Sequence, residues 1–242
     1  MVQRLATLIV QPVDSYKFTG LYEMSEASLY LRASREADRI YRVDSTKLIR
    51  WIRKGLSDRD LVGVSGADLL IGFEDLISLR VIAALRSAGV SFKVIYDAEK
   101  WLRKVSDHPR PFATEAMWTE GSQVFVQMCD RLIAASRAGQ MAFEHLKDWL
   151  IPVHGLAFDS HGVVIDWEPQ AGVLLSPDIQ LGSPCVKGTS IPTSAVWGMV
   201  EAGDSVEYVM SAYRLEREEV ESAIEWENKL RRLEHPVAVG SD

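Results

Sequence analysis

An eleven-residue run near the C-terminus, residues 182–192, constrains the fold more than any other part of the chain. It reads GSPCVKGTSIP. Its prolines fix φ and its glycines allow conformations that other residues avoid, so the run predicts a rigid turn. Residues 193–202, 205–213 and 216–231, which follow, have helical periodicity. The apolar spacing of Val220, Ala223 and Ile224 on the last of them predicts a compact three-helix unit.

The two halves of the chain carry opposite net charges. Residues 1–105 hold 17 Lys/Arg and 13 Asp/Glu, which gives +4, whereas residues 106–242 hold 10 and 21, which gives −11. Residues 201–227 alone contain nine acidic residues and two arginines. Although this unit has helix-turn-helix spacing, its charge would repel phosphate, so we expect a basic protein as its partner. The alternative is an acidic surface that only keeps the protein soluble.

A basic helix is predicted at residues 45–54, with Asp44 as its N-cap. Leu48, Ile49 and Ile52 form its inward stripe, and the opposite stripe carries only cations. Lysine and arginine neutralise phosphates, and arginine also reads guanine edges in the major groove. A solvated helix face is the alternative. The residues predicted to bind DNA are Arg42, Lys47, Arg50, Trp51, Arg53 and Lys54.

The neighbouring patterns place this helix in a winged helix-turn-helix over residues 20–105. A short helix with Ser25 as N-cap precedes it, and a glycine-rich two-stranded wing follows at residues 56–71. Two packing helices then cover residues 73–89 and 94–105. The predicted fold class is mainly α with small β elements. Its three parts are the winged helix-turn-helix, an α+β connector over residues 106–172, and a C-terminal three-helix, helix-turn-helix-like domain over residues 173–235.

The connector begins with the breaker HPRP at residues 108–111. Short strands are expected at residues 124–128, 132–135 and 141–143. One helix is expected at residues 143–150, and a hairpin at residues 156–165.

The sequence carries no phosphate-binding loop, nucleophile elbow or zinc signature. We therefore expect no catalytic residue, no metal and no cofactor. Asp159, Asp166 and Asp178 leave a minor hypothesis of a Mg²⁺-dependent enzyme, but turn aspartates more often serve as turn formers. The first apolar run, residues 5–10, is far too short to span a membrane, so a cytoplasmic location is expected.

The C-terminal sequence resembles a numbered domain-of-unknown-function family of VapB-type antitoxins. The likeness rests on the run at residues 182–192, on AGDSV at residues 202–206, and on Tyr213 before an acidic helix. It covers about residues 173–231. The family pattern is G-x-P-x-[VI]-x-G-T-R-I-P, and Ser190 stands where it has arginine. If that arginine contacts the toxin or braces the turn, its role here is lost or passes to Lys187 or Arg214.

The earlier chain looks like the longer members of this group, which join a MerR-like winged helix to that domain. YEMSEA at residues 22–27, LIGF at 70–73 and RAGQ at 137–140 carry the likeness. The resemblance implies a type II antitoxin that binds a PIN-like ribonuclease toxin and represses its own operon, as a homodimer or a hetero-oligomer with toxin. It does not imply small-molecule sensing, because sensor cysteines are absent. The expected toxin-binding residues are Lys187, Thr189, Ser190, Ile191, Trp197, Tyr213 and Arg214. The alternative is a stand-alone transcription regulator whose C-terminal domain binds another protein or a ligand.

Overall fold

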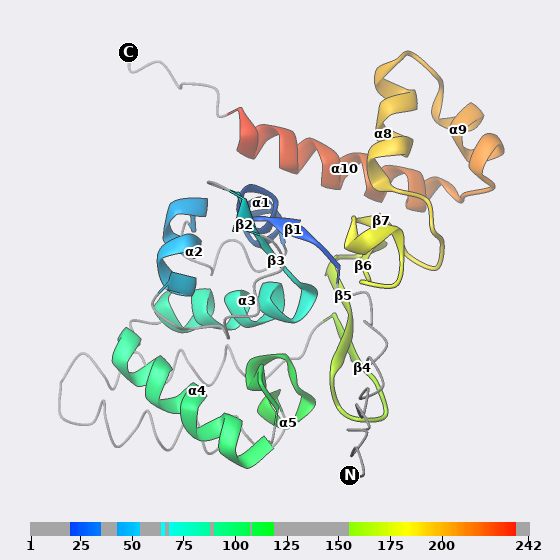
Figure 1. Cartoon of the computed structure of the whole chain (residues 1–242). Helices are drawn as coiled ribbons and strands as arrows, with labels where there is room; N and C mark the ends of the chain where they lie inside the picture. The colour runs from blue at the N-terminus through cyan, green and yellow to red at the C-terminus, as the bar shows by residue number, and fades with distance from the viewer. Residues whose placement is uncertain are drawn as a thin grey trace, which may run out of the picture.

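The computed structural model describes residues 20–34, 43–53, 64–65, 68–87, 90–106, 108–118 and 155–235. Over these residues the fold is mainly helical, with two small antiparallel sheets, as expected (Figure 1). None of the described helices combines the length and the apolar character needed to cross a bilayer.

The first sheet joins the start of the chain to a hairpin. Strand β3 (Asp68–Ile71) lies between β1 (Tyr22–Glu23) and β2 (Val64–Ser65), and both pairings are antiparallel. Helix α1 (Met24–Ala33) follows β1 directly, so Glu23 and not the predicted Ser25 is its N-cap. A capping box with Glu26 fixes this start, because the Glu26 carboxylate accepts a hydrogen bond from the Glu23 amide at 3.0 Å.

Three further helices complete the N-terminal part. They are α2 (Ser45–Trp51), α3 (Phe73–Ser87) and α4 (Phe92–Ser106). All three were predicted from apolar periodicity, and Leu76, Ile77, Ile82 and Ile95 are completely buried. The 3-10 turn η2 (Pro111–Ala113) and the short α5 (Glu115–Trp118) then pack beside α3 and α4 (Figure 1).

The second sheet has the order β4-β5-β6-β7. The predicted hairpin is confirmed as β4 (Leu156–Phe158) and β5 (Val164–Gln170). Strands β6 (Val173–Leu175) and β7 (Cys185–Val186) were not predicted. The expected boundary between residues 172 and 173 therefore falls in a tight turn of one continuous sheet. The expected connector elements at residues 124–150 lie outside the described residues.

The predicted C-terminal helices are confirmed as α8 (Thr193–Glu201), α9 (Val206–Tyr213) and α10 (Arg217–Glu234). Ser205 caps α9 by accepting a hydrogen bond from the Tyr208 amide, and Glu216 with Glu219 forms a capping box on α10. A small core holds the helices together. Its buried members are Val186, Val196, Val209, Leu215, Val220 and Ala223.

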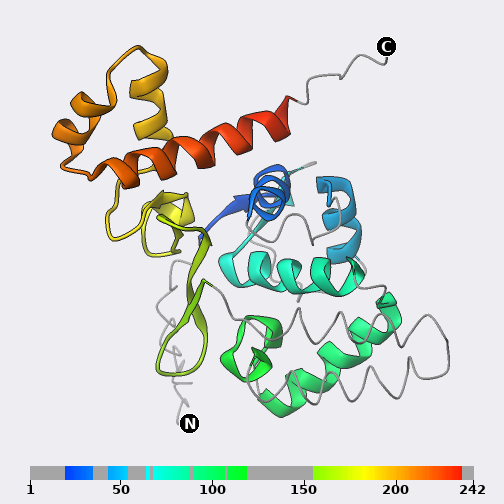
Figure 2. The ribbon, with the colours of Figure 1, turned by 180° about the vertical axis from the view of Figure 1, so that it is seen from behind.

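The N-terminal and C-terminal parts interlock through β1 and α1. The Tyr22 hydroxyl donates a buried hydrogen bond of 3.0 Å to the carbonyl of Gly182, in the 3-10 turn η3 (Gln180–Gly182). Helix α1 lies against α10, where the Tyr30 and Trp226 ring centroids are 6.1 Å apart (Figures 1 and 2). One hydrophobic core thus runs from Tyr22 to Leu230, across the predicted domain borders.

Candidate functional site

Helix α2 presents a basic outer face, as the sequence predicts. Its N-cap is Asp44, whose carboxylate accepts a hydrogen bond from the Lys47 amide at 2.8 Å. Leu48 is fully buried, and this fixes the rotation of the helix so that Arg50 and Arg53 are exposed. The Lys47 ammonium lies 3.7 Å from Asp44, in a partly exposed ion pair of small energetic value. Arg42 and Lys54 lie outside the described residues.

Trp51 belongs to the core and not to the predicted DNA-binding face. It is 5 % exposed, and its ring meets the edge of Phe92 with the centroids 5.7 Å apart. Trp51 stands three residues after Leu48, so both side chains fall on the inward stripe. The apolar spacing of α2 was therefore the signal that places Trp51 inside.

The turn at residues 182–192 is braced by its own polar groups. The Val186 amide donates to the Ile191 carbonyl at 2.9 Å, and the Thr189 hydroxyl donates to the Val186 carbonyl at 2.9 Å. The Thr189 hydroxyl also accepts from the Ile191 amide, so it works mainly as a structural clamp. Cys185 is buried, and burial raises the pKa of its thiol to about 11. It therefore remains a thiol that packs as an apolar group.

The structure places the expected toxin-binding residues on the turn at residues 182–192, on α8 and at the end of α9. Lys187 and Ser190 are exposed on the turn, where the Lys187 ammonium pairs with Glu168 at 2.7 Å. Ile191 and Tyr213 pack against the small C-terminal core, and each is only partly exposed. Arg214 is exposed after α9 with a φ of 56°, a left-handed conformation that ends the helix.

Two side chains that the sequence analysis did not single out, Asn228 and Arg231, fix the orientation of the partly exposed Trp197 ring. Its indole N–H donates to the Asn228 amide oxygen at 3.1 Å, and the Arg231 guanidinium lies 3.6 Å above the ring centroid. A partly exposed tryptophan with a stacked arginine is typical of the residues that dominate protein interfaces. Trp197 and Arg231 come from α8 and α10, so only the folded unit brings them together.

The acidic surface of the C-terminal helices is smaller than the sequence indicates. Arg217 pairs with Glu207 at 2.5 Å and with Glu221 at 3.6 Å, and Lys229 pairs with Glu225 at 2.9 Å. The carboxylates that pair with no cation among the described residues include those of Glu201, Asp204 and Glu218. These three lie on α8, on the loop after it and on the first turn of α10. Glu201 and Glu218 are exposed and Asp204 is partly exposed, and together they are called the acidic surface.

Glu227 is buried, although the sequence places it with the exposed acids. It is 7 % exposed, and the Thr193 hydroxyl donates to its carboxylate at 2.5 Å. Burial raises the pKa of Glu227, while the Thr193 hydrogen bond and the Arg231 charge oppose that rise. Ionisation of this carboxyl, at the contact between α8 and α10, should therefore make the free energy of unfolding depend on pH.

The change Glu227→Gln tests whether ionisation of the buried Glu227 carboxyl makes the stability of the fold depend on pH. Because the folded-state pKa is raised, the stability that Glu227 contributes is complete below its unfolded pKa and is lost as pH rises through the folded pKa. Glutamine stays neutral and can still accept the Thr193 hydrogen bond. Urea unfolding should show the variant more stable than the wild type near pH 7, with the difference shrinking toward about pH 4.

The control for this experiment is Glu225→Gln, because Glu225 is exposed and paired with Lys229. It should change the free energy of unfolding by less than about 1 kcal/mol. A Glu227→Gln variant that is less stable than the wild type near pH 7 would contradict the assignment.

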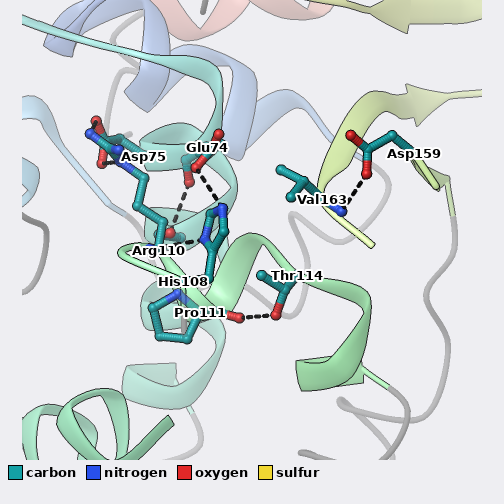
Figure 3. Close-up of polar contacts among 9 residues, drawn as sticks. Glu74, Asp75, His108, Arg110, Pro111, Thr114, Asp159 and Val163 are labelled. Atoms are coloured by element: carbon teal, nitrogen blue, oxygen red, sulfur yellow. Dashed lines mark hydrogen bonds and ion pairs between the residues drawn. The ribbon is translucent and has the colours of Figure 1, made fainter. Parts of the chain in front are cut away.

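The aspartates considered for Mg²⁺ do not form a ligand set. One Asp159 carboxylate oxygen accepts from the amides of His161 and Val163, both at 2.9 Å, so Asp159 shapes the β4–β5 turn (Figure 3). Within the described ranges, no three His, Cys, Asp or Glu side chains are grouped so that they could hold a metal ion.

Comparison with known proteins identifies part of the chain. Residues 173–226 match the family described as "Protein of unknown function (DUF433)", which agrees with the expected unknown-function domain at the C-terminus. The crystal structure of Rv2018 from Mycobacterium tuberculosis is similar, with 20 % identity and a TM-score of 0.64. That match covers 84 % of this chain and 96 % of that chain, and at this identity it shows a shared fold. No curated protein matches the sequence significantly.

Proposed function

We propose that this protein is the antitoxin of a type II toxin–antitoxin system. Its C-terminal unit binds and neutralises a PIN-like ribonuclease toxin, and its N-terminal part binds operator DNA and represses the operon. The observation that carries this proposal is the segregation of exposed charge. Arg50 and Arg53 project from α2, while Glu201, Asp204 and Glu218 are displayed around α8 and α10.

The N-terminal arrangement supports DNA binding. Helices α1 and α2 pack together beside the β2–β3 hairpin, in the order of a MerR-like winged helix-turn-helix. The basic face of α2 points away from the core that Leu48 and Trp51 enter. In a two-fold dimer, two such helices would meet half-sites about one helical turn of DNA apart.

The C-terminal unit supports binding of a basic protein. A ribonuclease surrounds its active site with cations that bind RNA, and an acidic surface attracts them and speeds encounter. Trp197 with its stacked Arg231 adds a partly exposed aromatic contact beside the acidic surface. The same helices would repel the phosphates of a duplex, because the nearby acids outnumber the cations.

The test is capture of the partner by the tagged full-length chain, produced from its native operon. We expect the chain to retain the product of the adjacent reading frame, and that product to be a PIN-like ribonuclease. Production of the partner alone should arrest growth, and co-production of this chain should restore it.

Two variants locate the binding surfaces. Neutralisation of the acidic surface by Glu201→Gln, Asp204→Asn and Glu218→Gln should lower capture about 10-fold or more, because charge complementarity speeds association. The triple variant Lys47→Gln, Arg50→Gln and Arg53→Gln should capture the partner normally. If the adjacent product is neither captured nor toxic, the stand-alone transcription regulator replaces this proposal.

A further inference from the structure

A pocket of about 400 Å³ opens between the start of α3, the loop before η2 and the turn of the β4–β5 hairpin. Its volume lies within the range of small-molecule sites. The pocket joins the N-terminal helices to the sheet that carries the C-terminal unit. Figure 3 shows Glu74 and His108 on one side and Asp159 on the other.

The floor of the pocket is apolar. Phe73 and Val164 line it and are held in place by the core at 1 % and 3 % exposure, and Ile165, which also lines it, is 38 % exposed and offers most of the apolar surface that a ligand can cover. An apolar group that enters gains from leaving water and meets a surface that needs no rearrangement. The floor therefore favours a ligand with a hydrocarbon body.

The rim of the pocket is acidic. Glu74, Asp159 and Asp178 line it together with His108 and His161, and among the described residues its lining contains neither lysine nor arginine. The nearest arginine is already engaged, because Arg110 holds both carboxylate oxygens of Asp75 at 2.6 and 3.3 Å. The N-terminus of α3 adds only about half a positive charge. A net negative potential remains, and it favours a cation.

The Glu74 carboxylate retains hydrogen-bonding capacity. Within the part of the chain that the structure describes, no side chain or amide donates a hydrogen bond to it, and His108 Nε2 lies 3.9 Å from one of its oxygens. His108 Nδ1 accepts from the Arg110 amide at 3.1 Å, so a neutral His108 ring carries its hydrogen on Nε2, too far away to bond. Burial raises the pKa of Glu74, His108 and Arg110 oppose that rise, and Asp75 and Asp159 add to it.

We propose that this pocket binds a small organic cation, with an amidinium, guanidinium or ammonium group on Glu74 and a hydrocarbon body on Phe73 and Val164. An amidinium or guanidinium matches a carboxylate through two parallel hydrogen bonds. A bare divalent ion is disfavoured by the geometry, because the described acids and histidines do not converge on one point. The inference stands apart from the proposed function.

The test uses benzamidine, an aromatic amidinium, and its neutral near-isostere benzamide on the full-length protein. Titration followed by calorimetry or by protein NMR should show benzamidine binding with a dissociation constant near about 1 mM and benzamide at least about 10-fold weaker. Glu74→Gln should weaken benzamidine at least about 10-fold, because it removes the charge that the amidinium needs. Glu225→Gln on α10 removes an exposed carboxylate elsewhere and should bind like the wild type.

The comparison of the two probes on the wild type keeps the proposal testable even if Glu74→Gln fails to fold. Equal affinity for benzamidine and benzamide would overturn the proposal, and so would the absence of benzamidine binding up to about 20 mM. Zn²⁺ binding that requires Glu74, without benzamidine binding, would make the pocket a metal site instead.

Discussion

Gly182→Ala should lower the free energy of unfolding by about 3–5 kcal/mol, the sum of overpacking, backbone strain and a damaged buried hydrogen bond. An added Cβ would lie 2.1 Å from the Tyr22 hydroxyl and 2.7 Å from the ring carbon that carries it. The backbone φ at this position is +89°, which an L side chain rarely adopts. Because Tyr22 is 1 % exposed, its ring has no room to retreat. Urea unfolding of the full-length chain measures the loss.

Gly188→Ala is the matched control for this prediction. Gly188 lies in the same turn with a φ of +81°, but nothing lies within 4 Å of an added Cβ. It should lose only the backbone cost of about 1–2 kcal/mol. Equal losses in the two variants would mean that contact between Tyr22 and Gly182 does not hold the N-terminal sheet to the C-terminal unit.

A large effect at Gly182 follows from how the chain is tied together. The Tyr22 hydroxyl bond to Gly182 spans 160 positions of sequence, and the Leu21 amide adds a bond of 3.2 Å to the Leu181 carbonyl. Burial raises the pKa of Tyr22, so its hydroxyl remains a donor at every physiological pH. The two charged surfaces thus share one rigid body, although they differ in sign.

Local signals were sufficient for most helices. Asp44 begins α2 as its capping pattern predicts, and Ser205 and Glu216, where the predicted ranges of the next helices start, are the caps of α9 and α10, because a cap is satisfied by residues within one turn. The hairpin of β4 and β5 followed from its turn residues in the same way. Strands β1, β6 and β7 have only two or three residues, too few to display a period. They were missed for that reason.

Long-range features of the candidate sites could not be predicted. The stacking of Arg231 on Trp197 and the burial of Glu227 depend on how α10 meets α8. The pocket collects side chains from four separate segments. Charge counts give the sign of a region, but only the fold shows which carboxylates remain exposed. Trp51 on α2 is different, because the local apolar spacing already places it on the inward stripe three residues after Leu48.

The second large effect is expected on the affinity of the protein for duplex DNA. The triple variant Lys47→Gln, Arg50→Gln and Arg53→Gln removes three cations from α2 and the residues directly after it, and it puts a neutral, polar, shorter side chain at each position. Phosphate contacts release counterions, so the slope of log affinity against log salt should fall by up to about 3. With base contacts by arginine also lost, the affinity for duplex DNA should fall about 100-fold or more.

The control for the α2 triple variant must remove the same number of positive charges from another part of the surface. Lys100→Gln, Lys104→Gln and Arg232→Gln also removes three exposed cations, from α4 and α10. It should keep most of the DNA affinity, because a general effect of net charge is weaker than direct contact with phosphate.

Fluorescence anisotropy of the chain's own upstream promoter duplex, titrated with full-length wild type and these two triple variants at several salt concentrations, tests the central claim most directly. We predict that the α2 variant alone loses binding and salt dependence. Unchanged affinity of the α2 variant, or an equal loss in the α4 and α10 variant, would contradict the assignment of α2 as the DNA-binding surface.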